Sequence, residues 1–321
     1  MSMRIAYFPG CALEGTAQDY ALSLEAIAPK LGLQLEELED WNCCGATAAH
    51  NLNHKLSLAL PARILALAER GGYESLVAPC AACSHRLITT AHVLEARKEL
   101  RQEIAGVIEL PYAGTVRVKN ILQVLQELGV ENIVAACTRK LTGLKIASYY
   151  GCLLVRPPKV VKFDDPEAPQ SMDRIIRALG GTPVDWGLKT ECCGGGFSMS
   201  RTDLVCKLVR ELLDNAASEG AEAFAVACPM CQSNLDLRQQ SVNQRYGTQF
   251  KLPALYITQW IGLCLGLSER ELGIDQHFVD AHEVVGKAFA PPLTLPSPQG
   301  GEGGVRGAQK APAAAALAGK A

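Results

Sequence analysis

The chain of 321 residues has no long apolar run, no strong charge of either sign and few aromatic side chains. Aromatic residues make up 6% of it, and its formal net charge is −2. A membrane-spanning helix needs about 20 consecutive apolar residues, and a nucleic-acid-binding domain usually carries a basic patch. The N-terminal stretch MSMRIAYFPGC also lacks the apolar core of a signal peptide. We therefore expect a cytoplasmic protein with no membrane insertion and no nucleic-acid partner.

Cysteine, in contrast, is abundant, with thirteen residues in the chain. Disulfides rarely persist in a reducing compartment, so an excess of cysteine in such a protein indicates metal binding or redox chemistry. The odd number also argues against a simple framework of disulfides. The spacing of the cysteines along the chain is therefore the best indication of their role.

Ten of the thirteen cysteines form two sets of five that follow the same order. The spacing is C-x31-CC-x35-CxxC in the first set and C-x39-CC-x34-CxxC in the second. The flanking sequences repeat as well, since IAYFPGCAL resembles IASYYGCLL and LVAPCAACSHRL resembles AVACPMCQSNL. This agreement predicts an internal duplication. The first set is Cys11, Cys43, Cys44, Cys80 and Cys83; the second is Cys152, Cys192, Cys193, Cys228 and Cys231.

Short apolar strands alternate with helical segments in both halves, which predicts an α/β fold of two pseudo-symmetric halves with mostly parallel sheets. In the first half we expect strands at 4–8, 33–39 and 74–79, and helices at 17–31, near 54–70 and from the CxxC motif onward. Further helices are expected near 85–106 and 117–128. In the second half we expect strands at 145–150, 182–186 and 223–228, and helices at 172–181, near 201–219 and near 231–246.

This layout places every repeated cysteine at the carboxyl end of a strand or at the start of the following helix. Open α/β sheets tend to bind ligands there, and helix N-termini favour thiolates. The glycines after each cysteine pair let the backbone approach closely, and Pro79 and Pro229 would stiffen the CxxC loops. The cysteines therefore occupy positions suited to a bound group.

The pattern predicts three segments along the chain. The first repeat covers 1–140 and the second covers 141–287. Residues 288–321 are rich in Pro, Gly and Ala and have almost no large apolar side chains. Such a segment cannot bury enough surface to offset its ordering entropy, so we expect a disordered tail.

The residues alone leave several bound groups open. Zinc takes four ligands, so each set could supply a Cys₄ site with one cysteine to spare. A thioredoxin-like CxxC would leave the other repeated cysteines unexplained. An ordinary cubane iron–sulfur cluster also takes four cysteines, and neighbouring side chains on an extended backbone diverge. Five ligands per set therefore hint at an unusual cluster.

The order and spacing of the ten cysteines resemble the duplicated cysteine-rich CCG domain found in the B subunit of heterodisulfide reductase. The resemblance covers about residues 4–266. It implies that each set of five cysteines binds a noncubane [4Fe–4S] cluster. It also implies the catalytic component of a thiol–disulfide oxidoreductase, in which a disulfide is cleaved or formed between the two clusters.

The chain has no ferredoxin-type run of closely spaced cysteines. The resemblance therefore implies two partners, a ferredoxin-like [4Fe–4S] protein similar to the C subunit of that enzyme and a flavin-containing protein similar to its A subunit. The substrate would be a small-molecule disulfide or a protein-bound thiol. One alternative is an iron–sulfur electron-transfer subunit for lactate- or glycolate-type hydroxy-acid oxidation. A non-catalytic interaction module braced by zinc is another.

The remaining candidate residues favour structural roles. Cys137, Cys206 and Cys264 have no counterparts in the repeat, and free cysteine packs as a small hydrophobic residue. The apolar segment 253–267 is interpreted as a core helix, with a partner-docking surface around Trp260 as the alternative.

Three histidines are interpreted as ordinary polar residues. His50 and His54 are four residues apart on an expected helix but have no third ligand nearby, so we expect them to be surface or half-buried residues. His85 follows the first CxxC motif, but its counterpart is Ser233. We expect His85 to be a polar loop residue rather than a ligand.

Overall fold

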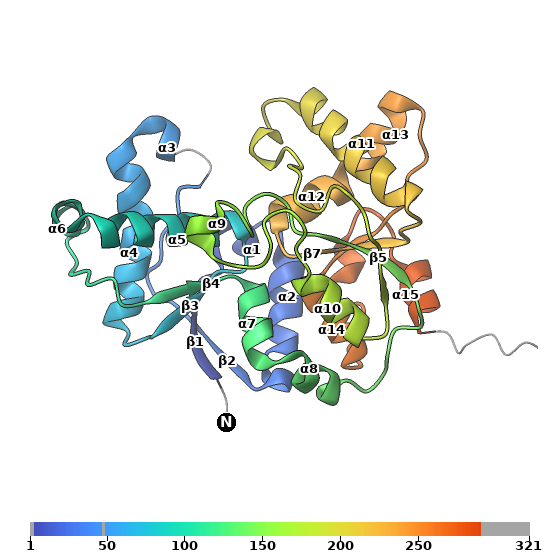
Figure 1. Ribbon diagram of the computed structural model, residues 1–321, viewed down its shortest axis with the longest axis horizontal. Helices are drawn as coiled ribbons and strands as arrows, with labels where there is room; N and C mark the ends of the chain where they lie inside the picture. The colour runs from blue at the N-terminus through green and yellow to red at the C-terminus, as the bar shows by residue number, and fades with distance from the viewer. Residues whose placement is uncertain (1–2, 47–48, 290–321) are drawn as a thin grey trace, which may run out of the picture. The chain divides into compact units, whose positions relative to one another are not determined.

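The computed structural model describes residues 3–46 and 49–289, in which two parallel four-stranded sheets form the framework (Figure 1). The strand order is β2-β1-β3-β4 in one sheet and β6-β5-β7-β8 in the other, the same order shifted by four strands. This repeat confirms the predicted pair of pseudo-symmetric α/β halves. The strands are β1 (Met3–Tyr7), β2 (Leu33–Glu37), β3 (Ser75–Val77), β4 (Arg117–Lys119), β5 (Lys145–Tyr149), β6 (Thr182–Pro183), β7 (Ala223–Val226) and β8 (Ala254–Tyr256).

Helices connect the strands and cover the sheets. The first half contains α1 (Gly10–Glu14), α2 (Gln18–Ile27), η1 (Pro29–Leu31), α3 (Ala49–Leu52), α4 (His54–Arg70), α5 (Ala81–Ala96), α6 (Lys98–Ile108), α7 (Ile121–Leu128) and α8 (Val130–Ala136). The second half contains α9 (Pro158–Val161), α10 (Ser171–Ala178), η2 (Gly195–Phe197), α11 (Thr202–Ser218), α12 (Pro229–Leu237), α13 (Gln239–Tyr246), α14 (Ile257–Cys264), η3 (Ile274–Gln276) and α15 (His282–Ala288).

The central strands are apolar because helices cover both of their faces. All four residues of β7 are buried, and β7 pairs in parallel with β5 on one side and with β8 on the other. Parallel strands covered on two faces have nearly continuous apolar sequences, as AFAV does here. The carboxyl ends of β5, β7 and β8 therefore lie at one edge of the second sheet.

The structure has a fourth strand in each half, β4 and β8, that the sequence pattern did not predict. Residues 117–128 were expected to be a helix but begin with β4 before α7 starts. Residues 253–267 likewise begin with β8, which is followed directly by α14. β8 is a buried apolar run of three residues, which periodicity cannot distinguish from the first turn of an apolar helix. β4 has the sequence Arg-Val-Lys and is not buried, so three residues of mixed character carry no strand pattern.

Two expected helices are also divided. The helix expected near 85–106 is α5 followed by α6, with Arg97 between them in a non-helical conformation. The helix expected near 231–246 is α12 followed by α13, which meet at Arg238. Of the expected tail, Ala288 belongs to α15, and residues 290–321 lie outside the described residues.

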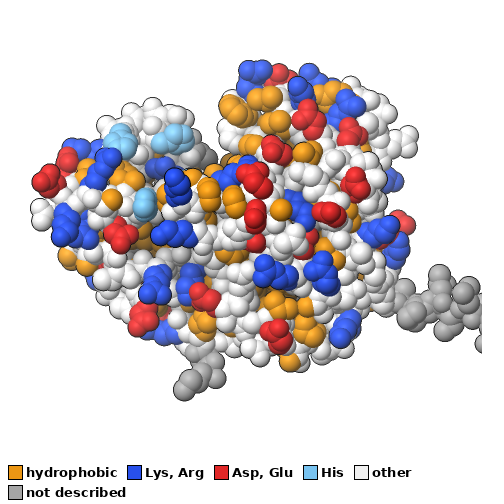
Figure 2. All heavy atoms as spheres, viewed as in Figure 1, with side chains coloured by type: hydrophobic (Ala, Val, Ile, Leu, Met, Phe, Trp, Pro, Cys, Tyr) orange, Lys and Arg blue, Asp and Glu red, His pale blue; other side chains and the backbone are white. Residues whose placement is uncertain are grey.

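None of the helices in the described part of the chain is long and apolar enough to cross a bilayer. On the face drawn in Figure 2, acidic and basic side chains are interspersed and do not separate into regions of one sign.

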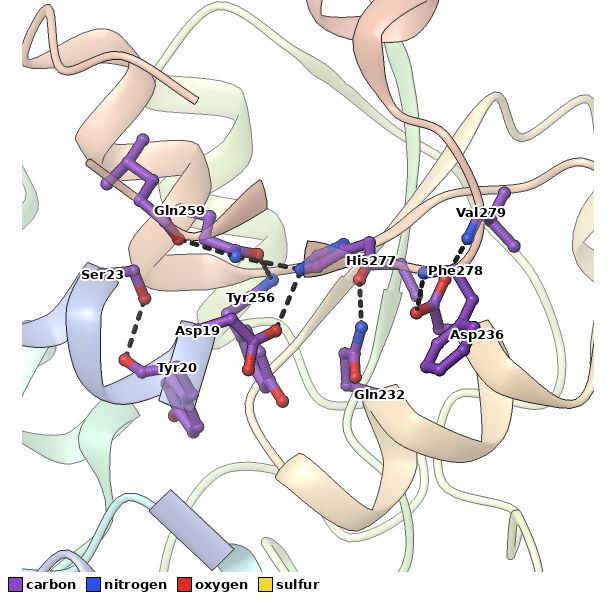
Figure 3. A network of polar contacts seen from close by, with 12 residues as sticks. Asp19, Tyr20, Ser23, Gln232, Asp236, Tyr256, Gln259, His277, Phe278 and Val279 are labelled. Atoms are coloured by element: carbon purple, nitrogen blue, oxygen red, sulfur yellow. Dashed lines mark hydrogen bonds and ion pairs between the residues drawn. The ribbon is translucent and has the colours of Figure 1, made fainter. Parts of the chain in front are cut away.

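The two halves share contacts within one compact unit. Helix α2 of the first half packs against α14 of the second half. The Ser23 and Thr258 hydroxyls are 2.7 Å apart, and the Asp19 carboxylate lies 3.0 Å from the ring of His277. Figure 3 shows Asp19, Tyr20 and Ser23 from α2 beside Tyr256 and Gln259 from the second half. Buried polar contacts therefore join the halves.

Candidate functional site

The repeated cysteines lie at the carboxyl ends of the strands, which confirms their expected positions. In each half, the first cysteine follows the first strand, the cysteine pair follows the second strand and the CxxC motif follows the third. Cys80 and Cys228 are the residues that precede α5 and α12. Because parallel strands end at a common edge, segments far apart in sequence converge there.

Within each half, the sulfur atoms meet in corresponding pairs. The sulfur atoms of Cys44 and Cys83 are 3.1 Å apart, and those of Cys193 and Cys231 are 3.6 Å apart. The contact with Cys83 lowers the pKa of Cys44 to about 7. Each pair joins the second member of the adjacent cysteines to the second member of CxxC. The duplication therefore extends to sulfur contacts in three dimensions.

The first cysteine of each set lies beside the first member of its adjacent pair. Burial and the nearby Cys43 sulfur raise the pKa of Cys11. Contact with the Cys152 thiol lowers the pKa of Cys192 to about 6, and the same contact raises the pKa of Cys152 above its ordinary value. A thiolate is the form that binds metal, so Cys192 is favoured in its ligating form.

The two sets meet at Cys80 and Cys228, which are both buried. The Cys228 sulfur is the main cause that raises the pKa of Cys80 well above its ordinary value. The contacts of Cys228 with Cys231 and Cys80 lower its own pKa well below the ordinary value. A cavity of about 70 Å³ beside the second set also reaches Ala81 of the first half. The structure thus brings the two sets together, although they are far apart in sequence.

Two glycines leave room beside these sulfur atoms. Gly10 and Gly151 each precede the first cysteine of a set and have φ angles of +66° and +64°. A Cβ atom would lie 3.2 Å from the Cys83 sulfur at Gly10, and 2.9 Å from the Cys231 sulfur at Gly151. Only glycine combines this backbone conformation with such a close approach.

Backbone N–H groups also point at sulfur after each cysteine pair. The N–H of Gly45 donates to the Cys43 sulfur at 3.4 Å, and the N–H of Gly194 donates to the Cys192 sulfur at 3.3 Å. Such donors stabilise thiolates and tune the potential of thiolate-bound metal groups.

A buried ion pair supports the second set, and sequence reasoning missed it. The Lys189 ammonium lies 2.9 Å from the Asp173 carboxylate, and the Tyr150 hydroxyl donates to the same carboxylate at 2.8 Å. The Lys189 carbonyl accepts the N–H groups of Tyr150 and Gly151. No feature of the repeat could reveal this network, because Asp40 stands at the position corresponding to Lys189.

The thiols of the two sets suit a thiolate-bound group. Among residues 3–46 and 49–289, no three Cys, His, Asp or Glu side chains are grouped so as to hold one metal ion. The thiols extend as a series of contacting pairs from one set to the other. The glycine spaces and the N–H donors suit a larger sulfur-rich group. The residues therefore fit the iron–sulfur expectation.

The unrepeated candidates are mostly structural. Cys206 and Cys264 are buried in the core, while Cys137 is half-buried against Cys264. Trp260 is fully buried and donates its ring N–H to the Phe224 carbonyl at 3.2 Å. The interpretation of residues 253–267 as part of the core is therefore confirmed, although the segment begins with a strand, β8, before the helix α14.

The three histidines also have ordinary environments. His50 and His54 are exposed as expected, although they belong to α3 and α4 rather than to one helix. His85 lies on α5 and is half-buried, which corrects the expected loop position.

The fold and the paired thiols define a duplicated cysteine-rich α/β protein, and comparison with known proteins agrees. The CCG cysteine-rich domain family matches residues 5–88 and again residues 146–236. The chain is 33% identical over 284 residues to the 8-methylmenaquinol:fumarate reductase membrane anchor subunit of Wolinella succinogenes, covering 88% of this chain and 99% of that protein. It is 30% identical over 293 residues to the B subunit of a CoB–CoM heterodisulfide reductase of Methanosarcina acetivorans, covering 89% and 97%.

The chain belongs to the family of CCG cysteine-rich domain proteins that includes the B subunits of heterodisulfide reductases. This membership implies iron–sulfur clusters. A crystal structure of a hypothetical protein from Helicobacter pylori aligns with a TM-score of 0.67 and 15% identity over 86% of this chain, which supports the fold alone. The chain spans about half of that structure, 52% of its length.

Proposed function

We propose that this chain is the catalytic iron–sulfur subunit of a multi-subunit thiol–disulfide oxidoreductase, with one noncubane [4Fe–4S] cluster on each set of five cysteines. The observation that carries the proposal is the meeting of the two sets at Cys80 and Cys228. A disulfide has two sulfur atoms and needs two electrons for cleavage. Two adjacent sites in one chain suit such a substrate.

The proposed ligands and their surroundings have separate tasks. The five cysteines of each set would hold one iron–sulfur cluster, and a bound cluster would supply one-electron transfer. Gly10 and Gly151 keep side chains away from the sulfur atoms, and the N–H groups of Gly45 and Gly194 stabilise negative charge. Burial of Cys80 and Cys228 excludes water from the junction.

Access to the site is asymmetric, which suits a substrate or partner that approaches from one side. Cys11, Cys43 and Cys192 are exposed, whereas the CxxC cysteines are buried. The approach side would receive a small-molecule disulfide or a protein-bound thiol. With the exposed cysteines on the approach side, Cys80 and Cys228 stay out of contact with solvent.

Exposed apolar side chains follow both cysteine pairs and support partner binding. Leu52 of α3 is 76% exposed, and Met199, close after η2, is 95% exposed. Leu52 lies nine residues after Cys43, and Met199 lies seven residues after Cys192, so both follow a cysteine pair without occupying matching positions. We propose that these side chains contact the ferredoxin-like or flavin-containing partner.

A second candidate function is electron transfer in a quinol-linked complex. It is favoured by the 33% identity to a quinol:fumarate reductase membrane anchor subunit over almost the whole of that protein. Like the hydroxy-acid oxidation alternative, it would use the same clusters without disulfide chemistry. Reaction partners therefore distinguish these candidates.

The experiment is anaerobic purification followed by metal analysis and two assays. Two four-iron clusters predict about eight irons per chain. Reduction of small disulfides by reduced viologen dye tests the first candidate. Oxidation of a quinol by the complex tests the second. Iron without disulfide turnover, but with quinol oxidation, would overturn the first candidate. Zinc in place of iron would contradict both and support the interaction module.

A further inference from the structure

Two tyrosines from different halves stack between the sheets. Tyr20 lies on α2 and Tyr256 ends β8, and their ring centroids are 4.0 Å apart with planes 4° from parallel. Both side chains are fully buried. Figure 3 shows the two residues beside the Asp19–His277 contact, where the halves meet. The pair therefore belongs to the interface between the two repeats.

The strand register places this pair next to the cysteine junction. Tyr256 pairs with Val226, the last residue of β7, and Cys228 follows two residues later. Adjacent strands are about 4.8 Å apart and rise about 3.3 Å per residue, so Tyr256 lies near the start of the Cys228 segment. Burial, then the Cys228 and Cys80 sulfur atoms, raise the pKa of Tyr20 well above its ordinary value. The same two sulfur atoms contribute to the raised pKa of Tyr256, after burial, Asp19 and Tyr20.

The hydroxyl groups of both tyrosines lack a hydrogen-bond partner among the residues that the structure describes. Buried hydroxyls in proteins are nearly always paired, so an unpaired one calls for an explanation. The polar side chains nearby, Gln259 and Asp19, make their contacts with other groups. The Gln259 side chain donates to the Leu272 carbonyl and accepts the N–H of Tyr256, and Asp19 contacts His277. Two unused donors therefore lie close to the junction of the cysteine sets.

We propose that the Tyr20 and Tyr256 hydroxyls donate hydrogen bonds to the sulfur-rich group held at Cys80 and Cys228, and thereby raise its reduction potential. This inference rests on the proposed function, because it requires the iron–sulfur group. A donor stabilises the reduced state more than the oxidised state, since the reduced state carries one more negative charge. A phenol hydroxyl is a donor at neutral pH, because the ordinary pKa of tyrosine is about 10.

The chain contains a matched control. Tyr7 is also buried, and its hydroxyl is also unpaired among the described residues. The pKa of Tyr7 is raised by burial and by Glu25, Glu37 and Glu14, with no contribution from cysteine. Tyr7 is also near enough to Tyr20 to contribute to the raised pKa of Tyr20. Tyr7→Phe therefore removes a buried hydroxyl of the same region whose own pKa is not raised by the sulfur atoms of the junction.

The test is a redox titration of the full-length, iron-loaded protein, followed by electron paramagnetic resonance. Tyr20→Phe and Tyr256→Phe keep the stacked rings and remove one oxygen each. Each change should lower the equilibrium constant for reduction about tenfold, which corresponds to about 59 mV for a one-electron couple. Iron content should remain that of the wild type, and Tyr7→Phe should leave the potential unchanged.

Three results would overturn the inference. Iron-loaded Tyr20→Phe and Tyr256→Phe proteins with wild-type potentials would show that no hydrogen bond is donated. An equal shift in Tyr7→Phe would show a general effect of losing a buried hydroxyl. Wild-type protein without iron would overturn the proposed function itself, and this inference with it. Should Tyr20→Phe fail to assemble, Tyr256→Phe alone decides, because its hydroxyl is predicted to act on the same junction.

Discussion

The ammonium group of Lys189 lies 2.9 Å from the carboxylate of Asp173, and both side chains are almost completely buried. The pair connects two cysteine-bearing segments of the second half. The Lys189 carbonyl accepts N–H groups from the segment that leads to Cys152, and Lys189 itself lies three residues before Cys192. The position of these two cysteines therefore depends on a buried charge pair.

Asp173→Asn should destabilise the protein strongly. It keeps the shape of the side chain but leaves the Lys189 charge buried without its partner, which typically costs about 3–5 kcal/mol. The free energy of unfolding in urea measures the loss. Combining Asp173→Asn with Lys189→Met should recover much of it, because no buried charge then remains.

The exposed pair formed by Arg201 and Asp203 provides the control for this prediction. Asp203→Asn should change stability little, since solvent screens surface ion pairs. If Asp173→Asn were as harmless as Asp203→Asn, the buried pair would not hold these segments together.

Gly10→Ala and Gly151→Ala should each remove the group bound by one set of cysteines. The new methyl group would lie 3.2 Å from the Cys83 sulfur or 2.9 Å from the Cys231 sulfur, where the bound group must fit. Two four-iron clusters give about eight irons per chain, so each variant should retain about four. Metal analysis of anaerobically purified protein measures the iron.

Gly32→Ala and Gly247→Ala are the matched controls. These glycines have φ angles of +70° and +67°, similar to those of Gly10 and Gly151, but a Cβ would meet nothing within 4 Å. They share the conformational cost of about 1–2 kcal/mol without the contact to sulfur. Equal iron loss in controls and test variants would trace the effect to backbone strain and not to the space beside sulfur.

Cys193→Ala should remove about half of the iron and leave the signal of the first half intact, because a four-iron group holds half of about eight irons. Cys206→Ala is the comparison, since Cys206 is buried in the core outside both sets. It should retain all the iron despite some loss of packing. Wild-type iron content in the Cys193 variant would exclude this member of the adjacent pair as a ligand.

The repeat could be predicted from the sequence because ten cysteines preserve their order, spacing and flanking residues. The same regularity identified three strands per half and the edge at which the cysteines meet. β4 and β8 were missed because each has three residues and runs directly into a helix. Length and periodicity carry too little information in such a segment.

The surroundings of the cysteines could not be predicted in the same way. Lys189, Tyr20 and Tyr256 have no counterparts that a repeat would reveal, and they reach the site through contacts distant in sequence. The meeting of Cys80 with Cys228 likewise depends on how the two halves pack. Pattern analysis finds residues that recur, whereas these contacts depend on tertiary structure.

The iron-free protein should show unequal reactivity at two exposed cysteines. Contact with Cys152 lowers the pKa of Cys192 to about 6, so at pH 7 most of this thiol is ionised. Burial and Cys43 raise the pKa of Cys11 above its ordinary value of 9.0, so little Cys11 thiolate exists at pH 7. The thiolate is the nucleophile, although a thiolate of low pKa is intrinsically less reactive, so iodoacetamide should modify Cys192 several-fold faster than Cys11.

Mass spectrometry at a series of pH values measures both rates. The rate at Cys192 should rise through about pH 6 and then level off, whereas the rate at Cys11 should still be rising above pH 9, its ordinary pKa. Loading with iron should protect both residues but leave half-buried Cys137, which belongs to neither set, as reactive as before. Equal rates at pH 7 in the iron-free protein would rule out the Cys152–Cys192 contact in solution. Undiminished alkylation of Cys192 after iron loading would rule it out as a ligand.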